Sequence, residues 1–139
     1  MPQNSPKILI ISSDTGGGHR SAAAALVEGV QRFWHSESKV VRVIKGVEES
    51  HHLTEKLVNG YNWVLRHRQH WMKYLYWVVN TVRPETRSFF LNRCTHYFVD
   101  VFEKYIPHVI VSVHPLTQHI VARVLKQLNL LGTVPLVTV

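Results

Sequence analysis

Four short runs of hydrophobic residues are spaced along the chain, and longer stretches with helical periodicity separate them. Unbroken apolar runs of this length are typical of strands in a parallel sheet, because helices cover both faces of such a sheet. Strands that alternate with helices also indicate an α/β domain. The pattern therefore predicts an α/β fold with a three-layer, Rossmann-like parallel sheet. Its four strands are expected at residues 7–13, 39–45, 108–113 and 134–139.

The stretches between these runs predict four helices, over residues 18–35, 53–82, 86–105 and 115 to about 128. Pro84 and Pro107 follow the second and third helices, and proline lacks the backbone N–H that a helix interior requires. Pro115 suits the first turn of the fourth helix, where that N–H is not needed. In a sheet of this kind, ligands bind at the carboxyl ends of the strands.

The longest predicted helix, residues 53–82, is amphipathic when drawn as one unbroken helix at about 100° per residue. A break near Gly60 or His67 would weaken this interpretation. One side is an apolar stripe that Arg68 interrupts. This stripe should face the core. The stripe consists of Leu57, Val58, Tyr61, Val64, Leu65, Met72, Leu75, Tyr76, Val79 and Val82. The opposite side carries Trp63, Arg66, His67, His70, Lys73, Tyr74 and Trp77. Aromatic rings and cations on an outward face favour a membrane interface with anionic lipids, although a second domain or subunit could cover the same face.

Three consecutive glycines follow the first predicted strand and precede an alanine-rich helix, in the segment Asp14–Arg20. Glycine lets the backbone adopt positive φ and approach a ligand closely. The backbone amides at the start of the helix then face an anion, assisted by the helix dipole. His19 falls on the first helical turn, where an imidazole can accept a proton at neutral pH. The segment predicts a phosphate-binding turn with a candidate base, and the alternative is a tight turn that carries a surface histidine.

The common nucleotide-binding patterns do not fit this turn. It lacks the Gly-Lys-Ser/Thr ending of a P-loop and the G-x-G-x-x-G of dinucleotide-binding folds, and no acidic residue ends the second strand. The pattern therefore favours an anion or sugar-phosphate site of another kind. Ser112 and His114 come at the end of the third strand and belong to the same edge of the sheet. The histidines lack the spacing and the acidic or cysteine neighbours of a metal site, so no metal is expected.

The chain of 139 residues carries a net charge of +7 with histidine neutral, and it contains one cysteine, Cys94. This length suffices for one domain with a core. The positive charge suggests an anionic partner, which could be a membrane, a phosphorylated substrate or nucleic acid. Nucleic acid is the weakest of the three, because the basic and aromatic residues lie on a helix with an apolar back and no nucleic-acid-binding motif occurs. The sequence contains no run of about 20 apolar residues, the length that a helix needs to span a bilayer.

Three stretches together resemble a known family. Asp14–Arg20, the basic and aromatic middle segment, and Ser112–His119 are similar to the N-terminal domain of monogalactosyldiacylglycerol synthases. The related bacterial processive diacylglycerol glucosyltransferases share the pattern, and the glycine turn is more distantly similar to that of the lipid II synthase. The resemblance extends from Lys7 to Val139. It implies the N-terminal, acceptor-binding half of a GT-B glycosyltransferase, which would transfer a hexose from a UDP-sugar to diacylglycerol.

The resemblance also implies roles for individual residues. His19 matches the family's general base, which acts on the acceptor hydroxyl. Thr15, Gly16, Gly17, Gly18, Arg20 and His114 are expected to line the cleft and bind the donor phosphates or the acceptor. Trp63, Arg66, Lys73, Tyr74 and Trp77 are expected to bind the membrane. No cofactor is implied besides the donor substrate, UDP-galactose or UDP-glucose.

The resemblance further implies partners and a location. Diacylglycerol and anionic membrane lipids are expected partners, and nucleic acid is not. The protein is expected to be a peripheral membrane protein, either at a cytoplasmic membrane face or on a membrane of the plastid or thylakoid type. Residues 1–139 match the acceptor domain only, so the donor-binding C-terminal domain is expected to be absent and this piece to be inactive alone. The UDP-sugar would then be bound by a longer polypeptide or a partner chain. The alternative is a non-catalytic membrane-docking subunit, or a truncated remnant, that needs a separate donor-binding chain.

Overall fold

A computed structural model of the protein describes residues 6–15, 17–34, 41–50, 52–82 and 88–139. Within these residues the chain forms one sheet of four parallel strands in the order β2-β1-β3-β4. The strands are β1 (Ile8–Ser12), β2 (Val41–Lys45), β3 (Val109–Ser112) and β4 (Leu136–Thr138). The predicted parallel sheet is confirmed, and each strand lies inside its predicted range. β1 is buried along its whole length, as expected for a central strand whose two faces are both covered.

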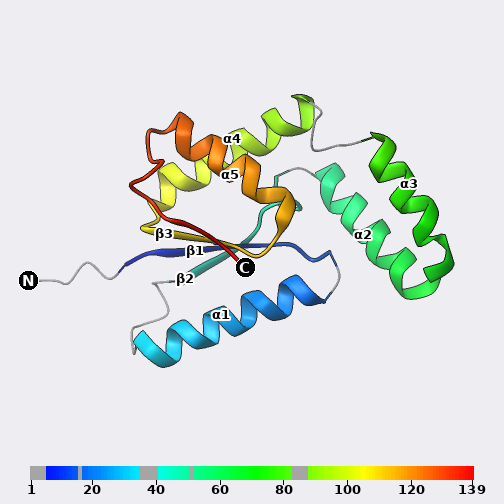
Figure 1. The fold of residues 1–139 in the computed structure, drawn as a ribbon, viewed down its shortest axis with the longest axis horizontal. Coiled ribbons are helices and arrows are strands. Elements are labelled where there is room, and N and C mark those ends of the chain that lie inside the picture. The colour runs from blue at the N-terminus through cyan, green and yellow to red at the C-terminus, as the bar shows by residue number, and fades with distance from the viewer. Residues whose placement is uncertain (1–5, 16, 35–40, 51, 83–87) are drawn as a thin grey trace, which may run out of the picture.

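Helices cover both faces of the sheet, as Figure 1 shows. α4 (Ser88–Tyr105) and α5 (Pro115–Gln127) lie on one face, and α1 (Gly18–Trp34) lies on the other. Side chains alternate between the faces along a strand. Leu9 and Ile11 of β1 therefore pack in the core under α4 and α5, whereas Ile8 and Ile10 pack against α1. The predicted three-layer α/β architecture is confirmed.

The larger core lies under α4 and α5 and holds the centre of the sheet in place. Phe98 and Phe102 of α4 and Val121 of α5 are almost completely buried in it, together with Ile110 of β3. Burial of apolar surface stabilises the fold by roughly 25 cal/mol per Å². The predicted start of the fourth helix is also confirmed, because α5 begins with Pro115 directly after β3. This core therefore fixes β1 and β3, the two strands whose carboxyl ends carry the candidate site.

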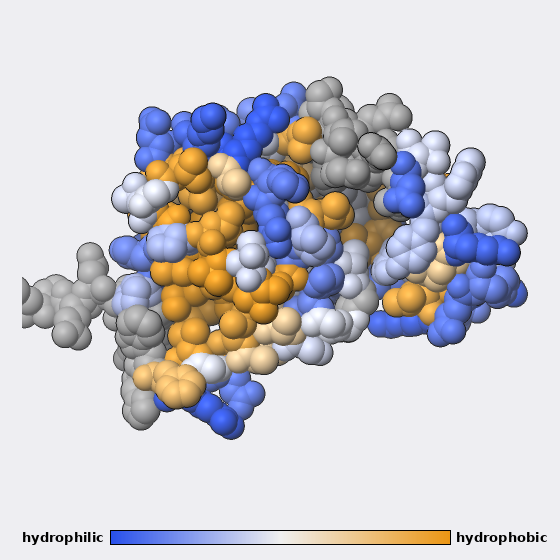
Figure 2. All heavy atoms as spheres, viewed as in Figure 1, coloured by the Kyte–Doolittle hydropathy of each residue, from blue (hydrophilic) through white to orange (hydrophobic). Residues whose placement is uncertain are grey.

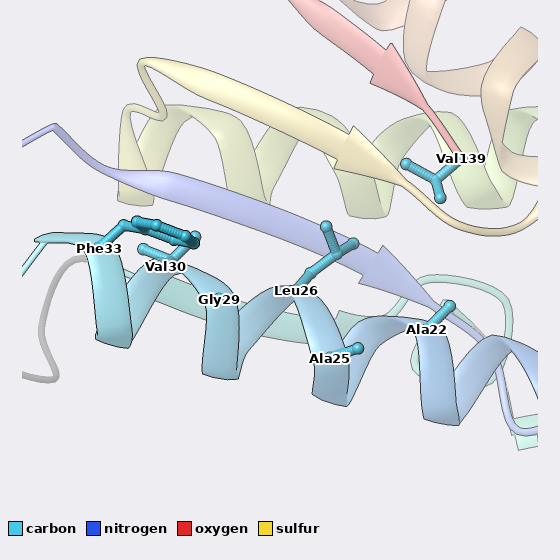
Figure 3. Close-up of a pocket in the computed structure, with 7 residues that line it drawn as sticks. All are labelled: Ala22, Ala25, Leu26, Gly29, Val30, Phe33 and Val139. Atoms are coloured by element: carbon cyan, nitrogen blue, oxygen red, sulfur yellow. The ribbon is translucent and has the colours of Figure 1, made fainter.

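The face beside α1 is less completely covered. A groove of about 510 Å³ runs along α1 toward the end of β4, where the side chain of Val139 projects toward the helix (Figure 3). Its lining is entirely apolar or glycine: Ala22, Ala25, Leu26, Gly29, Val30, Phe33 and Val139. Phe33 is 89% exposed. Figure 2 accordingly shows hydrophobic residues at the surface between α5 and α1.

The segment predicted as one helix over 53–82 is a helical hairpin. α2 (His52–His67) ends before Arg68, whose φ of −141° and ψ of 54° are not helical. A short 3-10 turn follows at Gln69–Trp71, and α3 (Met72–Val82) returns beside α2 (Figure 1). The prediction of an unbroken helix was therefore wrong. The break lies directly after His67, one of the two positions, with Gly60, at which a break was expected to weaken the single-helix interpretation.

The hairpin also departs from the predicted core-facing stripe. Val58 is buried, but Leu57 and Tyr76 are 70% and 56% exposed. Those two assignments were wrong because the hairpin extends away from the sheet, so most of its length has no core to face (Figure 1). The side chains of Val79 and Val82 lie outside the described residues. Partly buried positions of the stripe are Tyr61, Val64, Leu65, Met72 and Leu75.

Candidate functional site

The candidate site lies at the carboxyl ends of β1 and β3, the two central strands. Ile11 of β1 pairs with Ser112 of β3, so the residues that follow each strand are neighbours. The ring centroids of His19 and His114 are 4.6 Å apart, with an edge-on angle of 64° between the rings. The structure thus brings the glycine turn and His114 together at the edge of the sheet where the sequence placed both.

His19 is held in one orientation by the backbone. It lies in the first turn of α1 and is partly buried, and its Nδ1 is 2.6 Å from the carbonyl oxygen of Val113. Because a carbonyl oxygen only accepts hydrogen bonds, Nδ1 must carry the hydrogen. The neutral imidazole then has its lone pair on Nε2. This arrangement suits His19 to accept a proton from a hydroxyl group in the site.

The side chain of His114 is buried next to His19. It is 4% exposed, and its Nε2 is 3.0 Å from Oγ1 of Thr15. Burial, and secondarily the neighbouring His19, lower the pKa of His114 to about 4, so the ring is neutral at neutral pH. Its Nδ1 has no hydrogen-bond partner among the described residues. Thr15 and His114 therefore form a hydrogen-bonded pair, and the ring of His114 contacts that of His19.

The glycines of the turn leave open space at the start of α1. Gly17 and Gly18 are exposed, and a Cβ built on either would meet no atom within 4 Å. Neither has a positive φ, so the expectation that the turn needs glycine for its backbone conformation is wrong at these two positions. A side chain would instead fill the space before the helix N-terminus, where backbone N–H groups can bind an anion. Gly16, named with them, lies outside the described residues.

Arg20 does not join the histidine pair. It is exposed on the side of α1 that faces β2, where it lines a hollow of about 280 Å³ together with Asp14 and Lys45. His19 contacts Val113 on the opposite side, after β3. The turn therefore presents two different surfaces, one with the two histidines and one with exposed charges.

Asp14 anchors the turn through three separate contacts. Glu48 Oε1 accepts a hydrogen bond from its backbone N–H at 2.6 Å, and Asn62 Nδ2 donates one to its carbonyl oxygen at 2.7 Å. Its side chain forms an ion pair with Lys45, with Nζ and Oδ2 2.6 Å apart, and this hydrogen-bonded partner raises the pKa of Lys45. The start of the glycine turn is thus fixed by β2, by the segment after it and by α2.

Glu48 is a site residue that sequence reasoning missed. It is 8% exposed, and its Oε1 also accepts a hydrogen bond from Oγ of the fully buried Ser13 at 2.8 Å. No acidic residue ends the second predicted strand, but Glu48 comes three residues after Lys45. A pair of acidic residues just beyond a strand, at the edge where ligands bind, was the available signal.

All five predicted membrane-binding side chains are on the surface of the hairpin. They are Trp63, Arg66, Lys73, Tyr74 and Trp77. The two tryptophans are 52% and 68% exposed, and Lys73 Nζ lies 4.9 Å from the ring centroid of Tyr74. Trp71, in the turn of the hairpin, is 51% exposed and had not been included. None of the helices described is long and apolar enough to cross a membrane.

Metal-binding residues do not gather at this site. Among the described residues, no group of three or more histidine, cysteine, aspartate or glutamate side chains could hold a metal ion. The site that the structure describes is therefore built from two imidazoles, hydroxyl groups, one buried carboxylate and a helix N-terminus.

Comparison with known proteins gives one consistent family. The family model described as monogalactosyldiacylglycerol (MGDG) synthase matches residues 19–139. Monogalactosyldiacylglycerol synthase 1, chloroplastic, of Arabidopsis thaliana is 32% identical over 136 residues, which are 96% of this chain and 25% of that protein. The monogalactosyldiacylglycerol synthase, chloroplastic, of Spinacia oleracea is 30% identical over 143 residues, 99% of this chain and 27% of that protein. The chain thus spans about a quarter of the length of these relatives.

Proposed function

Because this chain belongs to the monogalactosyldiacylglycerol synthase family, we propose that it is the acceptor-binding domain of a glycosyltransferase. The proposed reaction transfers a hexose from a UDP-sugar to the free hydroxyl of diacylglycerol at a membrane surface. One observation carries this proposal: His19 donates from Nδ1 to a backbone carbonyl and so presents the Nε2 lone pair beside an open helix N-terminus. That geometry is what a base for an acceptor hydroxyl requires.

In the proposed reaction, Nε2 of His19 takes the proton of the acceptor hydroxyl. The hydroxyl oxygen forms a bond to the anomeric carbon of the sugar, and the bond from that carbon to the UDP phosphate breaks. The leaving UDP takes the bonding electrons as negative charge. Backbone N–H groups at the start of α1, next to Gly17 and Gly18, stabilise that charge. The donor itself would be held by residues outside this chain.

His114 supports this chemistry by staying uncharged. A protonated ring 4.6 Å from His19 would disfavour protonation of His19 and so weaken it as a base. The low pKa of His114 prevents that at neutral pH. We therefore assign His114 to shaping the site and not to proton transfer.

The hairpin of α2 and α3 is the proposed membrane-binding surface. Its exposed tryptophans suit the headgroup level of a bilayer, and Arg66 and Lys73 would each contribute about 1 kcal/mol of attraction to anionic lipid. The net charge of +7 acts in the same direction. The relatives named above are chloroplastic by name, which supports a plastid-type membrane, and the same names support galactose as the sugar.

The decisive experiment measures sugar transfer by a full-length family polypeptide that contains this sequence. Diacylglycerol in anionic vesicles is the acceptor, and UDP-galactose and UDP-glucose are compared as donors. His19→Ala should lower transfer by about 10²-fold or more, which is the usual contribution of a general base. His96→Ala, which removes an exposed histidine of α4, is the matched control. Transfer that survives in the His19 variant would eliminate His19 as the base.

Vesicle binding separates the catalytic proposal from the membrane proposal. His19→Ala should bind vesicles as the unsubstituted protein does. Replacing both Trp63 and Trp77 by serine should weaken vesicle binding by about tenfold or more, because each exposed ring loses its burial in the interface. Phe33→Ser removes a still more exposed ring from α1 and should leave binding unchanged. Equal binding by all variants would show that the hairpin is not the membrane surface.

A further inference from the structure

A continuous series of hydrogen bonds joins Glu48 to His114 through two hydroxyl groups. Ser13 Oγ lies 2.8 Å from Glu48 Oε1 and 3.1 Å from Oγ1 of Thr15. That Oγ1 in turn lies 3.0 Å from His114 Nε2. The four side chains come from the segments after β2, β1 and β3, so the series runs across three neighbouring strands at the edge of the sheet that carries the site.

The chemistry of the groups fixes the direction of every bond in the series. Ser13 donates its only hydroxyl hydrogen to the carboxylate oxygen of Glu48, so toward Thr15 it can only accept. The hydroxyl of Thr15 must therefore donate to Ser13, and it can only accept from His114. It follows that Nε2 of His114 carries the hydrogen and that Nδ1 of this neutral ring does not.

Glu48 fixes the turn through Oε1, but its burial also has a cost for the fold. Its second oxygen, Oε2, is buried and has no hydrogen-bond partner among the described residues, and the same holds for Nδ1 of His114. A buried polar atom without a partner destabilises the folded state, and a buried carboxylate does so strongly. Buried polar groups that destabilise the fold are expected at functional sites.

We propose that Glu48 is a positioning residue that sets the tautomer of His114 through Ser13 and Thr15, and thereby holds the ring against His19. The imidazole of His114 meets that of His19 edge-on. In the other tautomer the buried Nδ1 would carry a hydrogen with no acceptor among the described residues, so the ring would turn to satisfy it and lose this contact. The tautomer itself follows from the hydrogen bonds alone. Its consequence for sugar transfer rests on the proposed function.

Nitrogen NMR of the 139-residue protein with isotope-labelled histidine tests the tautomer directly. The two ring nitrogens of a neutral histidine have distinct signals according to which carries hydrogen, and His114→Gln identifies the signals of His114. The unsubstituted protein should show hydrogen on Nε2 only. Glu48→Ala removes the acceptor of the Ser13 hydroxyl and should give a mixture of both tautomers. Glu48→Gln keeps a carbonyl oxygen for that hydroxyl and should retain the single tautomer.

Two outcomes would overturn the proposal: a pure Nε2–H tautomer in Glu48→Ala, or equal mixtures in Glu48→Ala and Glu48→Gln. Glu103→Ala, at an exposed position of α4, is the control and should change nothing. If Glu48→Ala does not fold, Ser13→Ala interrupts the same series from its middle. Thr15 is then free to donate to Nε2, so the His114 hydrogen should move to Nδ1, and an unchanged tautomer there would refute the series.

Transfer assays separate this proposal from the proposed function. In the full-length polypeptide, Glu48→Ala should lower kcat about tenfold to a hundredfold by misplacing His19, with Glu48→Gln close to the unsubstituted enzyme. A changed tautomer with unchanged kcat would refute the positioning role alone. Activity retained in His19→Ala together with a changed tautomer in Glu48→Ala would refute the catalytic role of His19 and leave the control of the tautomer by Glu48 standing.

Discussion

Gly46 is a position where the structure sets both the sign and the size of a substitution's effect. It follows β2 directly, it is buried, and its N–H donates to the carbonyl of Ser12 at 3.1 Å. A Cβ added there would lie 2.7 Å from Cζ of Phe98 and 2.8 Å from Cγ2 of Ile11. Carbon atoms in contact are normally about 3.5–4.0 Å apart. Gly46→Ala therefore forces two side chains apart.

The neighbours of Gly46 have little room to move. Phe98 and Ile11 are both fully buried in the core under α4 and α5. Added methyl groups in a well-packed core destabilise by about 1–3 kcal/mol. The φ of Gly46 is not positive, so alanine adopts the backbone conformation and gains about 0.4–1 kcal/mol from a less flexible unfolded chain. The net expectation is a loss of about 1.3 kcal/mol in the free energy of unfolding, or a fall of roughly 4 °C in Tm.

Urea unfolding followed by circular dichroism measures this loss, with Gly29→Ala as the matched control. Gly29 lies inside α1, and a Cβ built on it meets no atom within 4 Å. Alanine there should stabilise the protein by up to about 1 kcal/mol because it favours helix. The two substitutions are chemically identical and should change stability in opposite directions. A Gly46→Ala protein as stable as the unsubstituted one would refute the packing argument.

Two further predictions concern buried titratable groups. The pKa of His114 is lowered to about 4 in the folded protein, so the unfolded chain binds its proton first, and the free energy of unfolding that His114 contributes should decline as the pH falls from about 6.5 to about 4. His114→Gln should therefore destabilise the protein more at neutral pH than at about pH 4.5 in urea titrations, whereas an equal difference at both would contradict the low pKa. Cys94 is 2% exposed, and burial raises the pKa of its thiol. A thiol reagent should therefore label Cys94 slowly in buffer and rapidly in urea. Rapid labelling of the folded protein would show that the core opens readily.

Much of the fold follows from local patterns in the sequence. The strands were predictable because both faces of a parallel sheet are covered, and their residues therefore read as unbroken apolar runs such as Ile8–Ile11. Pro115 marked the start of α5 for a similarly local reason, since its ring is compatible with a first helical turn. The place of His19 on the first turn of α1 needed only the strand, the glycines and the helix in order. Each of these features depends on residues that are neighbours in the chain.

The features that sequence reasoning missed depend on residues that are far apart in the chain. Glu48 acquires its role only beside Ser13, 35 residues away, and His19 is oriented by the carbonyl of Val113, 94 residues away. Neither pairing leaves a periodic signal, because both depend on how β1, β2 and β3 are placed side by side in the sheet. Whether the chain breaks beside His67 could not be decided from periodicity for a related reason: both helices of the hairpin are amphipathic, and it is the structure that shows α3 packed against α2. The sequence by itself therefore determined the strands, the helices other than the hairpin, and the glycine turn. The tertiary structure decided where the hairpin reverses and which polar groups meet at the site, because hydrogen bonds form between atoms close in space.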